Sequence, residues 1–142
     1  MTSGESLTRD GVVALTIPAK AEYIVLCRLA LSGLGRVRAL EPGLVADLKL
    51  ALTEACSNAV RHAYDAQHPG EVEVRYELDD ERLSVEVVDE GVGFDPEAAV
   101  AGAGDALDEG GLGISIIRAI VDELDIKSTG SGSSLRFTKY LA

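Results

Sequence analysis

The chain has 142 residues, of which 13 are Lys or Arg and 24 are Asp or Glu, so its formal net charge is −11. This length fits one domain with a core of its own, and we expect a single domain over residues 1–142. So large an acidic excess disfavours nucleic acid or an anionic membrane as a direct partner. The first residues lack the basic and then apolar pattern of a signal peptide, and no apolar run is long enough to span a bilayer. We therefore expect a cytoplasmic protein.

The first half of the chain predicts one strand and two helices. Residues 12–17, VVALTI, are apolar and partly β-branched, which predicts a strand. A helix is expected over 20–34, closed by Gly33 and Gly35. A second, longer helix is expected over 42–64, where apolar residues recur at helical spacing.

The middle of the chain predicts a hairpin followed by a long loop. Alternating or β-branched residues predict strands at 71–78 and 82–89. Residues 90–111 are rich in Gly, Ala and acidic side chains and are too long for an ordinary connection. This composition predicts a lid or a binding loop.

The last third of the chain predicts one more helix and two more strands. Helical periodicity returns over 112–124, and the strands are expected at 125–130 and 133–141. Taken in order, these elements predict an α/β two-layer sandwich, in which a mostly antiparallel sheet carries helices on one face.

A stripe of polar side chains runs along the longer helix. Glu54, Asn58 and His62 recur every four residues in ALTEACSNAVRHAY, so they stand one above another among alanines and leucines. Burying a carboxylate without partners is costly, and alanines leave room, so the stripe indicates a pocket. A helix edge with a solvated glutamate and a capped asparagine is the alternative that this spacing leaves open.

Two glycine clusters flank the long loop. DEGVGF (89–94) follows a strand, and GGLGIS (110–115) precedes a helix, where bare backbone N–H groups favour phosphate. Neither cluster is a Rossmann fingerprint, and the sequence has no Gly-Lys for a Walker A loop. No Lys or Arg occurs between Arg82 and Arg118, so a bound phosphate would need backbone dipoles and a divalent cation. The polar stripe on the longer helix offers oxygen ligands for that cation.

Asp89 ends an apolar strand and is followed by G-x-G. A buried carboxylate at this point could accept a hydrogen bond from an exocyclic amino group such as that of adenine. An aspartate that caps a turn is the alternative.

Three motifs, in this order, resemble the N, G1 and G2 boxes of the GHKL ATPase superfamily, which includes gyrase, Hsp90, histidine kinases and MutL. They are E-x-x-x-N in ALTEACSNAVRHAY, D-x-G-x-G in DEGVG and G-x-G in GLG. The segments KAEYIVLCRLALSG, EGGLGISII and FTKYL are similar to the small serine kinases that act as anti-sigma factors, the RsbW and SpoIIAB type. The resemblance spans about residue 12 to the C-terminus. It implies the Bergerat (GHKL) ATP-binding fold, with residues 1–11 loosely ordered and an ATP lid at about 94–109.

The resemblance implies a site for ATP and Mg²⁺. Asp89 would hold the adenine amino group, and Gly93, with Gly91 in the same motif, would let the ring approach. Asn58 would coordinate Mg²⁺ between the phosphates. Backbone N–H groups at the start of the following helix would contact the phosphates; they belong to Gly111, Leu112 and Gly113.

The same resemblance implies a catalytic carboxylate. Glu54 would be the general base that takes the proton from a substrate serine hydroxyl while the γ-phosphoryl group transfers. Arg61 stands where related kinases often have a basic residue that reaches phosphate, although a solvated arginine fits the position equally well. His62 is interpreted as a wall residue and is assigned no chemistry.

The function implied by the resemblance is that of an anti-sigma factor. It would bind and inhibit a sigma factor and use Mg-ATP to phosphorylate a serine on an anti-anti-sigma protein of the STAS type, as a homodimer. One alternative is a nucleotide-responsive anti-sigma module without kinase activity. Another is a switch serine kinase that acts on a stress-signalling scaffold. A histidine kinase would need a phosphoacceptor hairpin as well, and the chain is too short to hold both parts.

The first predicted helix is apolar on two sides. One face is expected to dock on the sheet; it is formed by Tyr23, Cys27, Ala30, Leu31 and Leu34. Val25 and Leu29 lie on another side, beside Arg28, and we expect this side to face another chain. The resemblance implies that Arg28 contacts the sigma factor. Cys27 and Cys56 are expected to be buried thiols.

Overall fold

The computed structural model describes residues 11–63, 70–89, 112–129 and 132–141. Helices and strands make up most of these ranges, and η1 is a single short 3-10 turn. In chain order the elements are β1 (Val12–Pro18), η1 (Ala21–Tyr23), α2 (Ile24–Val37), α3 (Pro42–Ala63), β2 (Glu71–Leu78), β3 (Arg82–Asp89), α6 (Leu112–Ile120), β4 (Glu123–Thr129) and β5 (Gly132–Tyr140).

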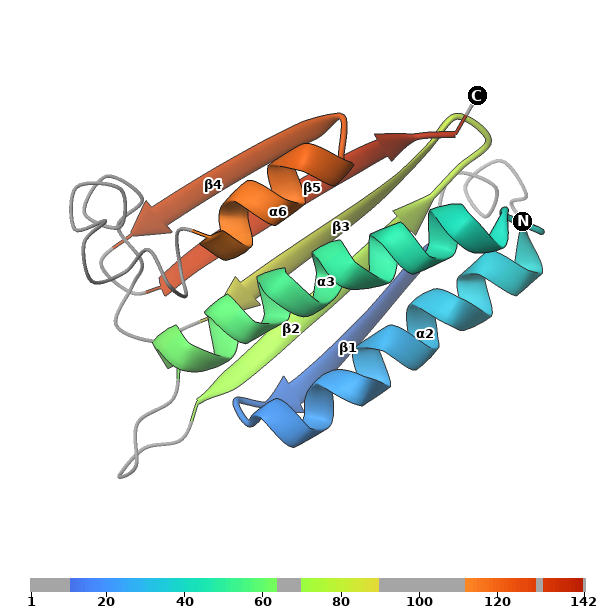
Figure 1. The fold of residues 1–142 in the computed structure, drawn as a ribbon. Helices are drawn as coiled ribbons and strands as arrows, with labels where there is room; N and C mark the ends of the chain where they lie inside the picture. The colour runs from blue at the N-terminus through green and yellow to red at the C-terminus, as the bar shows by residue number, and fades with distance from the viewer. Residues whose placement is uncertain (1–10, 64–69, 90–111, 130–131, 142) are drawn as a thin grey trace, which may run out of the picture.

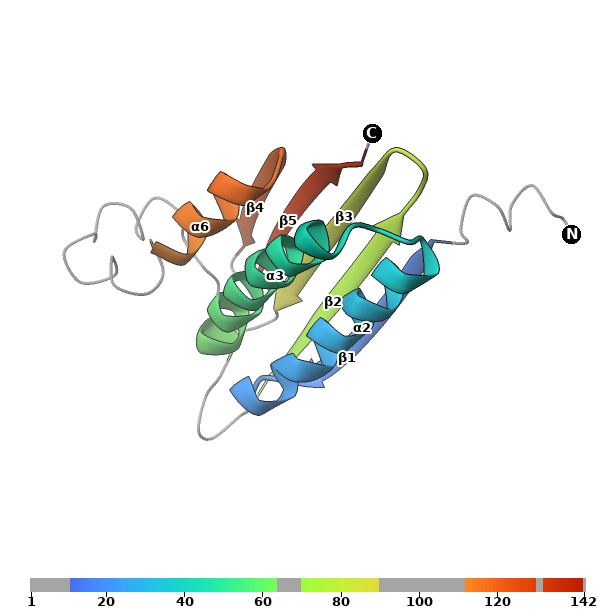
Figure 2. The same ribbon diagram turned by 45° about the vertical axis from the view of Figure 1, so that its right-hand side comes forward.

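The described strands form one five-stranded sheet in the order β1-β2-β3-β5-β4, and every neighbouring pair is antiparallel. Helices α2, α3 and α6 all lie over the same face of this sheet (Figure 2). The predicted two-layer α/β sandwich is therefore confirmed, as is the predicted order of helices and strands along the described parts of the chain.

Alternation along the strands explains why one face of the sheet carries the helices. In β2, Val72, Val74 and Tyr76 are fully buried, whereas Glu71, Glu73, Arg75 and Glu77 point to the opposite, open face. Side chains alternate between the two faces of a strand, so a one-residue shift of register would bury the charged set. The pattern EVEVRYEL thus decides which face is covered.

Helix α3 lies across the middle of the sheet, with α2 on one side and α6 on the other (Figure 1). Its buried face carries alanines at four-residue spacing, Ala51, Ala55, Ala59 and Ala63. Small side chains let the helix backbone lie close to the sheet, which brings the polar groups of α3 near the strand ends. None of the helices in the described ranges is long and apolar enough to cross a lipid bilayer.

The predicted end of the first helix is wrong. Gly33 and Gly35 do not close the helix, because α2 continues to Val37. A Cβ on the buried Gly35 would lie 2.8 Å from Cγ2 of Val45, so the missing side chain lets α2 approach α3. The chain turns at Ala39, whose φ of 54° lies in the left-handed region. Gly35 therefore marks the contact between α2 and α3 and not the end of α2.

The predicted helix over 112–124 is too long, and the strand predicted to follow it begins too late. Helix α6 ends at Ile120, and β4 already begins at Glu123. Leu124 pairs in register with Phe137 of β5. The segment IVDEL has apolar residues that suit either a helix or a strand, so pairing with β5 decides its structure.

The two cysteines are buried and free, as predicted. The hydroxyl of Tyr76 donates a hydrogen bond to the backbone oxygen of Cys27 at 2.7 Å, which ties β2 to α2 inside the core. The hydrogen-bonded Cys27 thiol and burial both raise the pKa of Cys56. Neither thiol is accessible for chemistry at the surface.

Candidate functional site

Asp89 ends strand β3 and is buried, with 3% of its surface exposed. Its strand partner across the sheet is Ser133 of β5, and the Ser133 hydroxyl donates a hydrogen bond to Asp89 Oδ2 at 2.6 Å. A carboxylate held in this way, at the end of an apolar strand, is oriented to accept further hydrogen bonds. Asp89 is thus a buried acceptor at the strand end, where the sequence places it.

A pocket opens between α3 and the sheet at this strand end. Its walls combine apolar side chains with a few polar ones, which is typical of small-molecule sites. The residues that line it are Ala55, Asn58, Ala59, His62, Val87, Asp89, Ile126, Ser133, Ser134 and Leu135. Ala55 and Ala59 have short side chains, so the wall formed by α3 is made of small groups beside Asp89.

His62 forms part of the pocket wall and is half-buried. Burial lowers the pKa of His62, and the charge of Arg61 lowers it further, while Asp89 and the backbone of Asn58 oppose the shift. The imidazole is therefore neutral near pH 7. This agrees with the interpretation of His62 as a wall residue.

Glu54 lies against the start of α6. A Cβ added to Gly113 would lie 2.9 Å from Glu54 Oε1 and 3.9 Å from Asn58 Nδ2. The glycine lets the Glu54 carboxylate approach the first turn of α6, where backbone N–H groups have no partner within the helix. The structure thus brings together Glu54, Asn58 and Gly113, three of the predicted site residues.

Asn58 is buried, with 5% of its surface exposed. Its Oδ1 accepts a hydrogen bond of 2.5 Å from Nη2 of Arg61, one turn further along α3. Its Nδ2 has no hydrogen-bond partner among the described residues. A buried amide nitrogen without a partner is unfavourable, which makes it a candidate contact for a ligand.

These residues fit a magnesium ion of the kind that is bound together with a nucleotide. The described ranges hold no group of three or more His, Cys, Asp or Glu that could hold a metal ion alone. Mg²⁺ in nucleotide sites usually takes one or two oxygens from the protein and the remainder from phosphates and water. Asn58 has one such oxygen, the atom that accepts the hydrogen bond from Arg61, and Glu54 lies one turn before it on the same helix.

Several predicted site residues lie outside the described residues. They are Gly91, Gly93 and Gly111, together with the expected lid at about 94–109. Leu112 is the first residue of α6.

Ser133 and Ile126 are among the pocket residues that the sequence analysis did not predict. Ser133 lies 44 residues after Asp89, and only the β3–β5 register brings the two together. Ile126 lines the pocket from β4, within a segment whose start was misplaced. Alternation along 132–138 could have indicated that Ser133 faces the same side as the buried Leu135 and Phe137.

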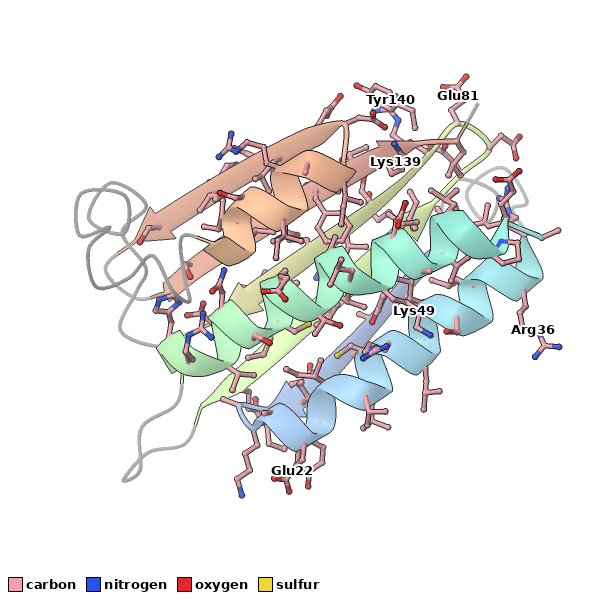
Figure 3. All side chains as sticks on the ribbon, in the orientation of Figure 1. Glu22, Arg36, Lys49, Glu81, Lys139 and Tyr140 are labelled. Carbon is pink, nitrogen blue, oxygen red and sulfur yellow. The ribbon has the colours of Figure 1, made fainter. Side chains whose placement is uncertain are left out.

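Helix α2 presents the second face that the sequence predicts. Cys27 and Leu31 are fully buried, whereas Val25 and Leu29 expose 52% and 61% of their surfaces. Arg28 is exposed beside them. Glu22, just before α2, and Arg36, near its end, both project away from α3 (Figure 3). The outer side of α2 is thus a mixed apolar and charged surface.

Known proteins share both the sequence and the fold. A family model described as the histidine kinase-like ATPase domain matches residues 17–139. The serine-protein kinase RsbW of Bacillus velezensis is 39% identical over 137 residues, which cover 91% of this chain and 85% of that protein. RsbW of Bacillus subtilis is 37% identical over 137 residues, with the same coverage. A crystal structure of the RsbU and RsbW domains of a Mycobacterium tuberculosis protein matches the fold with a TM-score of 0.69 at 21% identity, covering 92% of this chain and 32% of that one.

The sandwich, its pocket and the family match define a histidine kinase-like ATPase domain, which uses ATP. Within this class, the chain belongs to the RsbW family of serine-protein kinases. It is an ATP-dependent protein serine/threonine kinase. The predicted resemblance to the GHKL superfamily and to the RsbW type is thereby confirmed.

Proposed function

We propose that this kinase is a cytoplasmic, homodimeric anti-sigma factor. The kinase binds a sigma factor and keeps that factor inactive. It also phosphorylates a serine of an anti-anti-sigma protein of the STAS type. The proposal is supported by the likeness to RsbW kinases over most of the chain and by the exposed apolar side of α2. The observation that carries the catalytic part is the position of the Glu54 carboxylate against Gly113.

The nucleotide is proposed to bind with its adenine in the pocket beside Asp89. The carboxylate, oriented by Ser133, accepts a hydrogen bond from the adenine amino group, and Val87 and Leu135 contact the ring. This places the phosphates toward the start of α6, where backbone N–H groups and the helix dipole favour negative charge. Asn58 would hold Mg²⁺ through its side-chain oxygen. When bound, Mg²⁺ would neutralise charge on the transferring phosphoryl group.

Glu54 is proposed to act on the substrate serine. Its carboxylate accepts the proton of the serine hydroxyl as the serine oxygen bonds to the γ-phosphorus. The bond from that phosphorus to the bridging oxygen of ATP breaks, which leaves ADP and a phosphoserine. Most of the rate gain in such reactions comes from positioning and charge neutralisation, with general-base catalysis contributing about 10²–10⁴-fold.

A phosphoryl-transfer assay tests this proposal. Proteins captured by the wild-type kinase are incubated with ATP labelled in its γ-phosphate, and label on serine is measured for the wild type and for Glu54→Gln. We expect the variant to retain nucleotide binding while the rate falls by about 10²–10⁴-fold. The matched control is Glu73→Gln on the open face of the sheet, where the glutamate pairs with Arg75 far from α3.

The outcomes separate the alternatives. Equal rates for the wild type and Glu54→Gln would remove Glu54 from the chemistry. Capture of a sigma factor without any label transfer, in the presence of a STAS protein, would favour the binding module without kinase activity. Transfer to a scaffold protein in place of a small STAS protein would favour the switch kinase.

A further inference from the structure

Arg61 donates a hydrogen bond to Asn58 Oδ1, the oxygen that the proposed metal would need. Its Nη2 donates to Asn58 Oδ1 at 2.5 Å, a short distance for a hydrogen bond between a guanidinium and an amide. Arg61 and Asn58 are three residues apart on α3, a spacing at which helical side chains meet. The group that hydrogen-bonds to Asn58 Oδ1 is therefore a cation of the protein itself.

The hydrogen bond also fixes which way the Asn58 amide points. A guanidinium group has donors and no acceptor, so the atom that faces Arg61 must be the carbonyl oxygen. The amide nitrogen then lies on the other side, 3.9 Å from the position of a Cβ on Gly113, and has no partner among the described residues. In this orientation, Asn58 presents an N–H donor toward the start of α6, where a phosphate would lie.

The Arg61 side chain has room to leave Asn58. Arg61 is exposed near the end of α3, and it lines an open pocket with Lys20, Glu22 and Val60 on its outer side. A guanidinium displaced from Asn58 thus has space on the side of α3 that faces this pocket.

We infer that Arg61 is a stand-in cation, which holds Asn58 when no metal is bound and competes with Mg²⁺ for the same oxygen. This inference rests on the proposed nucleotide site. Two positive charges within a few ångströms of one oxygen repel each other, and the repulsion is strong because Asn58 is buried. Without the metal, Arg61 keeps the Asn58 N–H directed toward the start of α6, where it can bind a phosphate, so Arg61 should help metal-free nucleotide to bind. When Mg²⁺ is bound, Arg61 should be dispensable.

Calorimetric titration with ADP tests the competition, because ADP binding needs no turnover. ADP is titrated into the wild type and Arg61→Ala, once with excess MgCl₂ and once with EDTA. We expect Arg61→Ala to lose about 10–100-fold in affinity in EDTA, the range of one charge-assisted contact. In MgCl₂ the affinity should stay equal or become tighter. Removal of Mg²⁺ should thus weaken binding more in the variant than in the wild type.

Two further variants complete the test. Arg75→Ala removes one positive charge from the open face of the sheet, where Arg75 pairs with Glu73 at 3.5 Å, and should follow the wild type in both conditions. Arg61→Lys keeps the charge and should recover part of the affinity in EDTA. This recovery separates a charge effect from a general disturbance of α3.

The result that overturns the inference is distinct from the result that overturns the proposed function. If the wild type binds no ADP in either condition, the nucleotide site itself is wrong, and the inference falls with it. If the wild type binds ADP but Arg61→Ala loses the same factor with and without Mg²⁺, the site stands and the competition is refuted. An equal loss would make Arg61 an ordinary phosphate contact or a structural residue.

Discussion

The Ser133 hydroxyl donates a hydrogen bond to the Asp89 carboxylate across the β3–β5 pair, with 2.6 Å between the oxygens. The two residues are register partners where β3 ends and β5 begins, so the sheet itself sets their distance. The carboxylate is buried and lines the same pocket as Val87, Ala59 and Leu135, so a hydrogen-bond donor such as Ser133 offsets the cost of its burial. This pair thus connects the topology of the sheet to the chemistry of the pocket.

The first prediction concerns Asp89. In Asp89→Asn, one carboxylate oxygen becomes an NH₂ group, which cannot accept a hydrogen bond from adenine. We expect ADP affinity, measured by calorimetry, to fall by about 10–100-fold. Ser133→Ala keeps the carboxylate and loses only its orientation, so its loss should be smaller. Unchanged affinity in Asp89→Asn would remove this residue from the adenine site.

The second prediction concerns Gly113. A methyl group at this position would lie 2.9 Å from Glu54 Oε1, the movable end of a flexible side chain. We expect Gly113→Ala to fold with nearly unchanged stability but to displace the Glu54 carboxylate, so phosphoryl transfer should slow by about tenfold or more within the range for a general base.

The control for this substitution is Gly33→Ala in α2, where an added Cβ meets nothing within 4 Å. Because alanine favours a helix more than glycine does, Gly33→Ala should raise the free energy of unfolding by about 0.5–1 kcal/mol. Its kinase rate should match that of the wild type. A normal rate in Gly113→Ala would show that the contact with Glu54 is not needed for the chemistry.

The sequence was sufficient for the layers of the fold and for the positions of Glu54, Asn58 and Asp89, because both depend on local spacing. The i, i+4 stripe places Glu54 and Asn58 on one face of α3, and alternation in β3 places Asp89 at a buried strand end. Ser133 could not be found in this way, because its partner lies 44 residues away and only sheet register joins them.

The helix ends show a second limit of local patterns. Gly35 suits a helix end as well as a close helix contact, and the neighbouring Val45 decides between them. The end of α6 is likewise set by the pairing of Leu124 with Phe137. In each case the observed structure depends on a residue of another helix or strand, which a local sequence pattern does not include.

The third prediction concerns the turn between β2 and β3 and its dependence on pH. Asp79 Oδ1 accepts backbone hydrogen bonds from Glu81 at 2.8 Å and from Arg82 at 2.9 Å. These bonds lower the pKa of Asp79 below its usual 3.8. The ionised form is thus favoured in the native state, and its stabilising effect is complete above the unfolded pKa and lost as the pH falls through the folded pKa.

We therefore expect Asp79→Ala to lower the melting temperature at pH 7, and the difference from the wild type to shrink below about pH 4. Thermal denaturation followed by circular dichroism across this range measures the effect. Asp80→Ala is the matched control, because Asp80 forms an exposed ion pair with Arg38 at 2.9 Å, and such pairs contribute little. A difference that stays constant with pH would mean that the Asp79 charge is not responsible.

The last prediction concerns the outer side of α2. Val25 and Leu29 expose more than half of their surfaces, and Arg28 lies between them in sequence. The buried side of the same helix is already covered by the core through Cys27 and Leu31. An exposed arginine beside aliphatic side chains is a frequent centre of a protein interface. We propose this side of α2 as the surface that captures the sigma factor.

Arg28→Ala should therefore weaken capture of the sigma factor by ~2 kcal/mol or more, the range of an interface hot spot, while ADP affinity and melting temperature stay unchanged. Arg36→Ala is the matched control, because Arg36 is exposed on the same helix but lies about 12 Å further along its axis. Capture is measured by surface plasmon resonance with the purified sigma factor. Equal losses in both variants would indicate a general effect of charge, whereas full binding by a folded Arg28→Ala protein would place the interface on another surface.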